Sequence, residues 1–154
     1  MSKVIQYNDI DGVKQITMNS LKTKGEFRIY EKVYASLSTI FTNEEAMDIR
    51  KRFVRQNIKI KELTNAAYQD VDTSVISGFN ALVEIRYIDP KIINYETEII
   101  IYNDTVAFYR YGNDPYGVEI IDKNFAETQR QIFDQLWRKA SRPVIGKRGR
   151  SSLI

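Results

Sequence analysis

The chain has 154 residues and a formal net charge of +3, a length that suits one domain with a sizeable core. It contains no histidine and no cysteine, which excludes Ser-His-Asp and Cys-His catalysis, histidine-based zinc sites and disulfides. No apolar run approaches the roughly 18 residues that a membrane crossing needs, and no signal-peptide core is present, so we expect a cytoplasmic protein without membrane contact.

The predicted start of the chain consists of a helix, a strand and an ambiguous segment. Residues 8–23 carry apolar side chains at helical spacing and begin at Asn8, a good helix cap. Glu26–Tyr30 alternates polar and apolar side chains, as a half-buried strand does. Glu31–Phe41 fits a helical stripe and a loop equally well, so both interpretations stay open.

A basic helix and a charged strand are predicted next. Thr42 and Glu45 have the spacing of a capping box, which predicts that a helix begins there. Asn57–Leu63 alternates strictly, with Ile58 and Ile60 on the inner face. Charged side chains at the alternate positions favour a strand that has one face in water or lies at the edge of a sheet.

A weakly patterned segment then leads into another strand. Residues 64–80 have no clear period and are expected to be a link. Leu82–Ile88 is rich in β-branched and aromatic side chains, and Asp89 and Pro90 end it. Strands therefore alternate with helices, an order that is typical of an α/β protein.

The most regular part of the sequence predicts a sheet with a helix packed on it. Three β-rich runs follow one another, at Glu98–Tyr102, Thr105–Tyr109 and Gly117–Ile121. Asn103-Asp104 joins the first two runs and predicts a tight hairpin, since both residues tolerate a positive φ. Asp122 can cap the helix that follows. The inner stripe of that helix consists of Phe125, Gln129, Ile132, Phe133, Leu136, Trp137 and Ala140.

The end of the chain differs from the rest in composition. Residues 142–154 contain a proline, two glycines and four basic side chains without any apolar period. This composition predicts a basic, flexible C-terminal tail. Residues 1–141 then form a single α/β domain in which helices flank a mixed sheet.

The succession of these segments resembles a known domain. FRIY, NIKIKEL, VEIRYIDP, EIIIYNDTVAF, GVEIID and FDQLWRKA occur in this order over roughly residues 10–140. They resemble the C-terminal effector domain of TrmB-type transcriptional regulators, which has the phospholipase-D-like α/β fold. The resemblance implies a single phospholipase-D-like domain that regulates or senses a ligand.

The chain also departs from this family. Catalytic phospholipase-D relatives carry a His-x-Lys-(x)4-Asp motif on the hairpin, where the nearest spacing here gives Thr97, Ile99 and Asp104. Without that histidine and lysine the chemistry has no means to run, so we expect no enzyme activity, no cofactor and no metal site. TrmB-type regulators place a winged-helix domain ahead of the effector domain, and the short segment before the first predicted helix leads us to expect a stand-alone module. Because the fold usually occurs as two lobes, we also expect a homodimer.

Side chains around the predicted hairpin are candidates for binding a small polar ligand such as a sugar. Aromatic faces with polar groups beside them can stack on a ligand and form hydrogen bonds with it. These candidates are Tyr102, Tyr109, Tyr111, Asn113, Asp114 and Tyr116. Tyrosines also suit half-buried strands, and Gly-Asn-Asp-Pro also suits a plain turn, so a structural explanation stays open.

Basic side chains provide an alternative function, in which the protein is nucleic-acid-associated or a scaffold. Lys and Arg can neutralise phosphates in a salt-dependent way. The candidates are Arg50, Arg52, Arg55, Lys147, Arg148 and Arg150. Acidic residues interleave with the first three, as on any solvated helix face, whereas the tail is less diluted.

Two charged residues of the strand Leu82–Ile88 also need an explanation. Glu84 and Arg86 share one face, and a helix over that face would require them to pair. Arg28 or Glu26 on the first strand are candidate partners. We favour a structural network over a ligand site.

Overall fold

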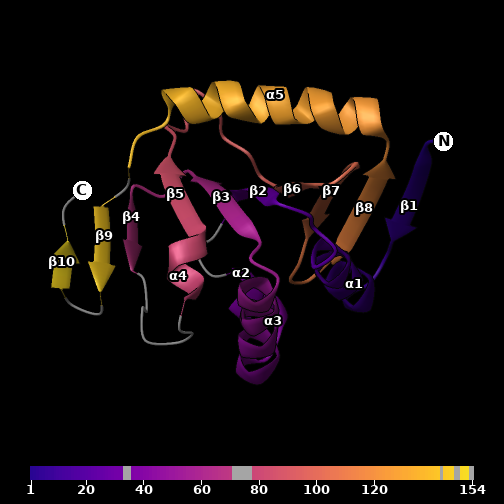
Figure 1. The fold of residues 1–154 in the computed structure, drawn as a ribbon, viewed down its shortest axis with the longest axis horizontal. Helices are drawn as coiled ribbons and strands as arrows, with labels where there is room; N and C mark the ends of the chain where they lie inside the picture. The colour runs from indigo at the N-terminus through magenta and orange to yellow at the C-terminus, as the bar shows by residue number, and fades with distance from the viewer. Residues whose placement is uncertain (33–35, 71–77, 143, 148–149, 153–154) are drawn as a thin grey trace.

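The computed structural model of the protein describes residues 1–32, 36–70, 78–142, 144–147 and 150–152. Seven strands form a mixed sheet in the order β1-β8-β7-β6-β2-β3-β5, with helices on both faces (Figure 1), as the sequence predicts. The strands are β1 (Lys3–Tyr7), β2 (Glu26–Glu31), β3 (Lys59–Thr64), β5 (Val83–Tyr87), β6 (Glu98–Tyr102), β7 (Thr105–Arg110) and β8 (Tyr116–Ile121). The described helices are α1 (Ile10–Ser20), α2 (Ser36–Ile40), α3 (Asn43–Arg55), α4 (Phe79–Leu82) and α5 (Lys123–Lys139).

Strand direction decides which residues meet at each edge of the sheet. β2, β3 and β5 are parallel to one another, and β6 runs antiparallel to β2. The ends of β2 and β3, at Glu31 and Thr64, therefore lie at the same edge as the beginning of β6, at Glu98. We call this edge the carboxyl edge.

The first face of the sheet is covered by α1, α2 and α3. Ile16 from α1 and Ile49 from α3 are buried there beside strand residues such as Phe27. The rings of Phe27 and Phe53 pack edge to face, with centroids 5.9 Å apart. We call this side of the sheet the α1/α3 face.

The opposite face is covered by the single long helix α5, which runs across the strands from the β8 side to the β5 side (Figure 1). Phe133 is completely buried, and its ring lies 5.0 Å from that of Tyr30 on β2. Trp137 is buried as predicted, in one cluster with Leu63 and Ile101. We call this side the α5 face.

The predicted hairpin and the caps of α3 and α5 are confirmed, whereas α1 is capped by Asp9 and not by Asn8, because the Asp9 side chain accepts the Gly12 N–H. Asn103 has φ 48° in the turn between β6 and β7, and the two strands pair from Tyr102–Thr105 onward. Thr42 and Glu45 form the capping box of α3. Asp122 accepts a hydrogen bond from the backbone N–H of Phe125, 2.8 Å away, and so caps α5. Local sequence signals are reliable here because each cap is completed within one helical turn.

Two strands differ from the sequence-based expectation. β1 forms an edge of the sheet by pairing antiparallel with β8, so the start of the chain contributes a strand that its pattern does not predict. β3 lies inside the sheet between β2 and β5, which excludes the edge position, one of the two alternatives that its charged pattern leaves open. Its Lys61 is accommodated on the α5 face by Glu26 of β2 and by the ring of Trp137 on α5.

The segments with weak patterns also gain structure. Ser36–Ile40 is the short helix α2, whereas residues 33–35 of the ambiguous segment lie outside the described residues. Three short strands form a second small sheet: β4 (Tyr68–Asp70), β9 (Val144–Lys147) and β10 (Arg150–Ser152). The backbone of the predicted tail is thus partly paired, a difference that arises from the distant partner β4.

Among the described helices, none has both the length and the apolar content that a membrane crossing requires.

Candidate functional site

Three of the four tyrosines predicted to bind a ligand lie on the α1/α3 face, where they donate to two different carboxylates. Tyr102 donates a hydrogen bond to Glu119, 2.8 Å away. Tyr109 and Tyr111 both donate to Glu98, at 3.3 and 2.7 Å. The structure therefore brings Tyr109 and Tyr111 together and holds Tyr102 elsewhere.

The other three candidates lie in or beside the turn between β7 and β8. Asn113 and Asp114 are exposed, and Asp114 forms an ion pair of 2.7 Å with Arg110. The same guanidinium lies 5.1 Å from the centre of the Tyr116 ring, which also contacts Phe108. These contacts are local to the turn, and they do not join the carboxylates on the α1/α3 face.

Glu119 is a buried carboxylate whose hydrogen bonds are satisfied. Tyr7, Tyr102 and Asn19 donate to it at 2.5, 2.8 and 2.9 Å, from β1, β6 and α1. Burial and this carboxylate together raise the pKa of Tyr7 to about 12. Three donors from three elements identify Glu119 as a structural anchor that fastens β1 to the rest of the sheet.

A second group of carboxylates gathers near the carboxyl edge. Glu62 on β3 lies opposite Ile29 on the parallel strand β2. Ile29 in turn lies opposite Ile100 on the antiparallel strand β6. Ile29 and Ile100 are core residues of the α1/α3 face, so alternation along the strands directs Glu31, Glu62 and Glu98 to this same face. All three glutamates are buried. We call them the carboxylate cluster.

Glu62 is the unusual member of the carboxylate cluster. Its side chain is 6% exposed, and within the described residues it forms no hydrogen bond or ion pair. Burial, reinforced by the nearby charge of Glu98, raises the pKa of Glu62 to about 8. Ionising a buried carboxylate that has no partner costs free energy, so such a group is either protonated or binds a cation.

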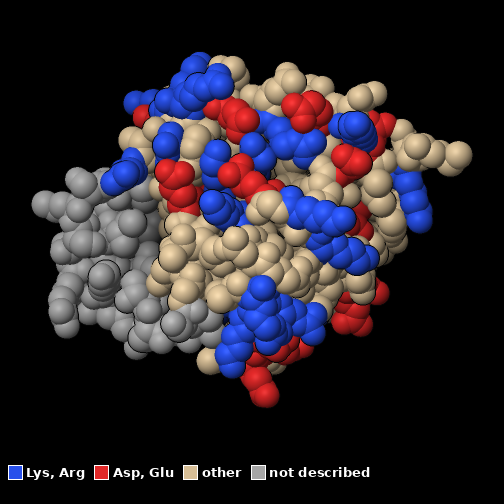
Figure 2. Space-filling model, in the orientation of Figure 1, with Lys and Arg blue, Asp and Glu red and all other residues tan. Residues whose placement is uncertain are grey.

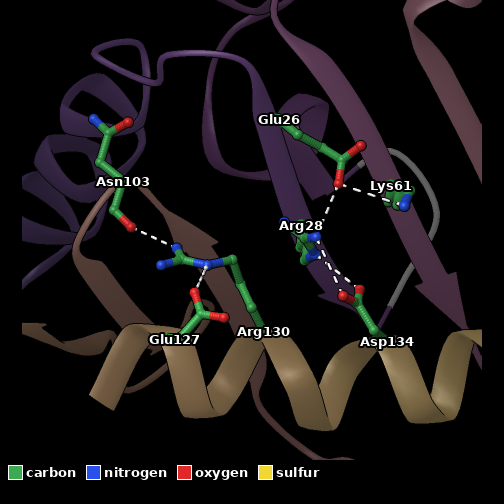
Figure 3. Close-up of polar contacts among 7 residues, drawn as sticks. All are labelled: Glu26, Arg28, Lys61, Asn103, Glu127, Arg130 and Asp134. Carbon is green, nitrogen blue, oxygen red and sulfur yellow. Dashed lines mark hydrogen bonds and ion pairs between the residues drawn. The ribbon is translucent and has the colours of Figure 1, made fainter. Parts of the chain in front are cut away.

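Carboxylates on the α5 face are paired, in contrast to Glu62. Figure 3 shows Arg28 of β2 between Glu26 and Asp134 of α5, with nitrogen–oxygen distances of 3.1 Å to each. Lys61 lies 3.5 Å from Glu26. The cations of β2 and β3 thus point toward α5, and the carboxylate cluster lies on the other side of the sheet.

The remaining contacts of α5 are also those of a structural network. Arg130 donates to the carbonyl oxygen of Asn103 at 2.5 Å and forms an ion pair of 3.1 Å with Glu127 (Figure 3). Arg86 donates to the carbonyl oxygen of Trp137 at 3.0 Å, and its guanidinium lies 4.6 Å from the centre of that ring. These bonds fasten α5 to the hairpin turn and to β5.

Glu84 and Arg86 follow the structural interpretation that the sequence favours. They pair with each other at 3.5 Å, and neither forms an ion pair with Arg28 or Glu26 among the described residues. In the parallel register Glu84 lies beside Lys61. Glu84 and Arg86 therefore lie on the α5 face, as Arg28 does, but they pair with each other and not with Arg28 or Glu26.

The positions that correspond by spacing to the phospholipase-D motif are spread along the hairpin. Thr97 precedes β6 near the carboxyl edge, Ile99 packs toward α5, and Asp104 is exposed in the turn at the opposite end of the strand. These three residues do not form a common site. Within the described residues, no three His, Cys, Asp or Glu side chains are arranged to hold a metal ion.

The basic candidates lie on α3 and in the C-terminal segment. Arg52 forms an ion pair of 3.2 Å with Asp48, Arg50 donates to Ser38, and Arg55 is exposed. Figure 2 shows blue side chains gathered over α3 with red side chains next to them. Lys147 and Arg150 lie in β9 and β10, of which the backbone is described, and Arg148 lies outside the described residues.

Sequence reasoning missed the carboxylate cluster, although one signal for it was present. Strict alternation in Asn57–Leu63 places Glu62 on the same face as Ile58 and Ile60, which the pattern assigns to the interior. A charged residue at an inner position of a strand is a candidate for function. Its neighbours on β2 and β6 could be identified only from the strand order.

Comparisons with known proteins give a likeness in structure. No protein-family model matches the sequence, and no curated protein matches it. TrmBL2, an archaeal chromatin protein described with a novel mode of DNA binding, aligns with a TM-score of 0.60 at 15% identity over 90% of this chain. The match spans 52% of TrmBL2, so this chain covers about half the length of that protein.

Two phospholipase-D-type structures align over almost their whole length. NucT from Helicobacter pylori gives a TM-score of 0.60 at 12% identity, covering 92% of this chain and 99% of NucT. Nuc from Salmonella typhimurium, a phospholipase D family member, gives 0.57 at 13% identity, covering 91% and 97%. The chain therefore has the phospholipase-D-like α/β fold, as its resemblance to the effector domain of TrmB-type regulators implies.

Proposed function

We propose that the protein is a non-catalytic regulatory module that senses a small polar ligand through the carboxylate cluster. The observation that carries this proposal is the position of Glu31, Glu62 and Glu98 near the carboxyl edge. Open α/β sheets bind ligands beyond the carboxyl ends of their strands. Tyr109 and Tyr111 lie on the same cluster and add aromatic faces, so two of the tyrosines predicted from the sequence belong to the proposed site.

The absence of catalysis is part of the proposal. Phosphodiester cleavage in the phospholipase-D manner needs a histidine nucleophile, and the sequence contains no histidine. Buried carboxylates repel a phosphate group, whereas nucleases present cations to it. The charge of the cluster therefore favours a ligand other than a phosphodiester.

The cellular setting follows from the likeness to TrmB-type regulators. We propose a cytoplasmic homodimer that takes part in transcription regulation. The homodimer is proposed because two lobes normally complete this fold. Light scattering of the purified protein at several concentrations should give twice the monomer mass, and a monomer mass throughout would contradict the dimer.

Ligand-dependent thermal stability tests the sensing function. The protein would be melted alone and with a panel of neutral sugars, amines and phosphodiesters, because a ligand at 100 times its Kd adds about 2.7 kcal/mol of stability. For a domain of this size that is a rise in Tm of roughly 5 to 10 °C. The stabilisation should be lost in Glu98→Gln and kept in Glu127→Gln, whose carboxylate is on the exposed side of α5. A panel without any stabilising compound would count against the module.

Nucleic-acid association is the second candidate function, and the structural likeness to TrmBL2, a DNA-binding chromatin protein, favours it. Lys51 and Arg55 on α3 are exposed and could contact phosphates. Binding of a labelled DNA duplex should weaken steeply as salt rises, and Lys51→Glu with Arg55→Glu should abolish it. Salt-independent binding, or none, would remove this candidate.

A further inference from the structure

We propose that the carboxylate cluster binds a protonated amine, with the carboxylate of Glu62 as its principal contact. This inference rests on the proposed sensing function and specifies the chemical class of its ligand. The geometry behind it is a buried carboxylate that no described side chain pairs, on a face where two further carboxylates lie on neighbouring strands.

The first step concerns Glu62 itself. Its side chain is only 6% exposed, yet no described residue donates a hydrogen bond to it. Burying an ionised carboxylate without a partner costs several kcal/mol in a protein interior. An ammonium group would remove this cost, because it brings a positive charge and three N–H donors to the same oxygen atoms.

The second step concerns the neighbours of Glu62. Glu98 on β6 accepts hydrogen bonds from Tyr109 and Tyr111, which bring two aromatic rings to the cluster. The electron-rich faces of these tyrosines also attract cations. Tyr111 is only partly buried, so solvent reaches the ring at this side of the cluster. Carboxylates with aromatic rings beside them form a suitable environment for an ammonium group.

The third step excludes other classes of ligand. A phosphate or carboxylate ligand would oppose the ionisation of Glu62, because two negative charges would then lie side by side. A bare metal ion needs several ligand atoms around one point, and the described acidic side chains offer no such arrangement. A neutral sugar could use the same hydroxyls and carboxylates, but it brings no positive charge that would stabilise ionised Glu62.

Amine binding should be linked to a proton. Glu98 on β6 and Glu31 on β2 share the face of Glu62, and Tyr95 approaches it from the segment before β6. Arg50 on α3, the helix that covers this face, directs its guanidinium to Ser38 and lies over the Phe79 ring. With a pKa of about 8, Glu62 is mostly protonated at neutral pH, so an amine must displace that proton to the buffer.

Isothermal titration calorimetry with putrescine tests the proposal, with 1,4-butanediol as the matched neutral probe. Putrescine should bind at pH 8.5, and butanediol, which has hydroxyls in place of the two ammonium groups, should not. If only ionised Glu62 binds, the affinity at pH 8.5 should exceed that at pH 6.5 by about 20-fold. Titrations at pH 7 in two buffers of different ionisation enthalpy should show about one proton released per amine bound.

Two isosteric variants separate the proposed contact from a general effect of charge. Glu62→Gln should abolish putrescine binding and the proton release while preserving the fold, since it replaces a buried charge by a neutral amide of the same shape. Glu84→Gln, on the α5 face, should bind putrescine as the parent does. Circular dichroism would establish that both variants are folded.

Each outcome decides the proposal. Equal putrescine affinity in Glu62→Gln, equal affinity for butanediol, or no putrescine binding at pH 8.5 would overturn it. Stabilisation by a neutral sugar without any amine binding would overturn the amine and keep the sensing module. A protein that responds to no compound of either class would overturn both.

Discussion

The buried glutamate on β3 should make the protein less stable as the pH rises through neutrality. Glu62 has a pKa of about 8 in the folded protein, against the ordinary value of 4.5 in an unfolded chain. The folded state therefore holds a proton that the unfolded state releases above pH 4.5. Its stabilising effect is complete below that value and is lost as the pH approaches and passes 8.

The size of the effect follows from this difference in pKa. Each pH unit between the two values is worth about 1.4 kcal/mol of unfolding free energy. Complete ionisation of Glu62 in the folded state thus costs about 5 kcal/mol, of which roughly half is lost between pH 6 and pH 8.5. The chain contains no histidine and no cysteine, so few other groups titrate in this interval.

Urea unfolding at half-unit intervals between pH 6 and pH 8.5 would measure this loss. Wild type should lose roughly 2 to 3 kcal/mol over the interval, whereas Glu62→Gln should change little and should be the more stable protein at pH 8.5. Glu84→Gln serves as the control and should follow the wild-type curve. A flat wild-type curve, or a parallel loss in Glu62→Gln, would refute the reasoning.

Four further expectations concern chemistry, the core, the N-terminal strand and the end of the chain. The purified protein should hydrolyse a chromogenic phosphodiester and labelled single-stranded DNA only at background rates, and turnover above background would contradict the non-catalytic assignment. Trp137→Ala should cost on the order of 3 to 5 kcal/mol in urea unfolding, and a Tm within a degree or two of the parent would show that α5 does not depend on this ring. Gly12→Ala should destabilise by about 1 to 3 kcal/mol, because a Cβ there would lie 2.4 Å from Cβ of Tyr7, and an unchanged Tm would mean that β1 can shift freely. Deleting residues 142–154 should leave the main transition nearly unchanged, since both described core clusters end before that segment, and a large drop in Tm would show that the second sheet supports the first.

Much of the fold can be predicted because its signals are local. The hairpin at Asn103, the capping box at Thr42 and the stripe that buries Trp137 each depend on residues within a few positions of one another. The order of these segments was then sufficient for a resemblance to the phospholipase-D-like fold. A tertiary partner was not needed for any of these predictions.

The parts that could not be predicted depend on distant partners. β1 is a strand because its backbone forms hydrogen bonds with β8. Val144–Lys147 pairs in the same way with β4, which is far away in sequence. The carboxylate cluster needs the strand order β6-β2-β3, which places Glu98 and Glu62 on the same face without any sequence proximity. Proximity in the sequence therefore groups four tyrosines with Asn113 and Asp114. In the structure only Tyr109 and Tyr111 of these share a carboxylate, that of Glu98.

The pairing of β1 with β8 has a consequence for the time course of folding. Lys3 lies opposite Ile121, so β1 has no partner until the chain as far as β8 has been synthesised. Contacts between residues so far apart in sequence raise the contact order and slow folding. Tyr7 must also wait for Glu119, the acceptor on β8 that anchors it. We expect the other strands to assemble first and the edge formed by β1 to close last, so a nascent chain halted before β8 should expose its N-terminal strand to proteases.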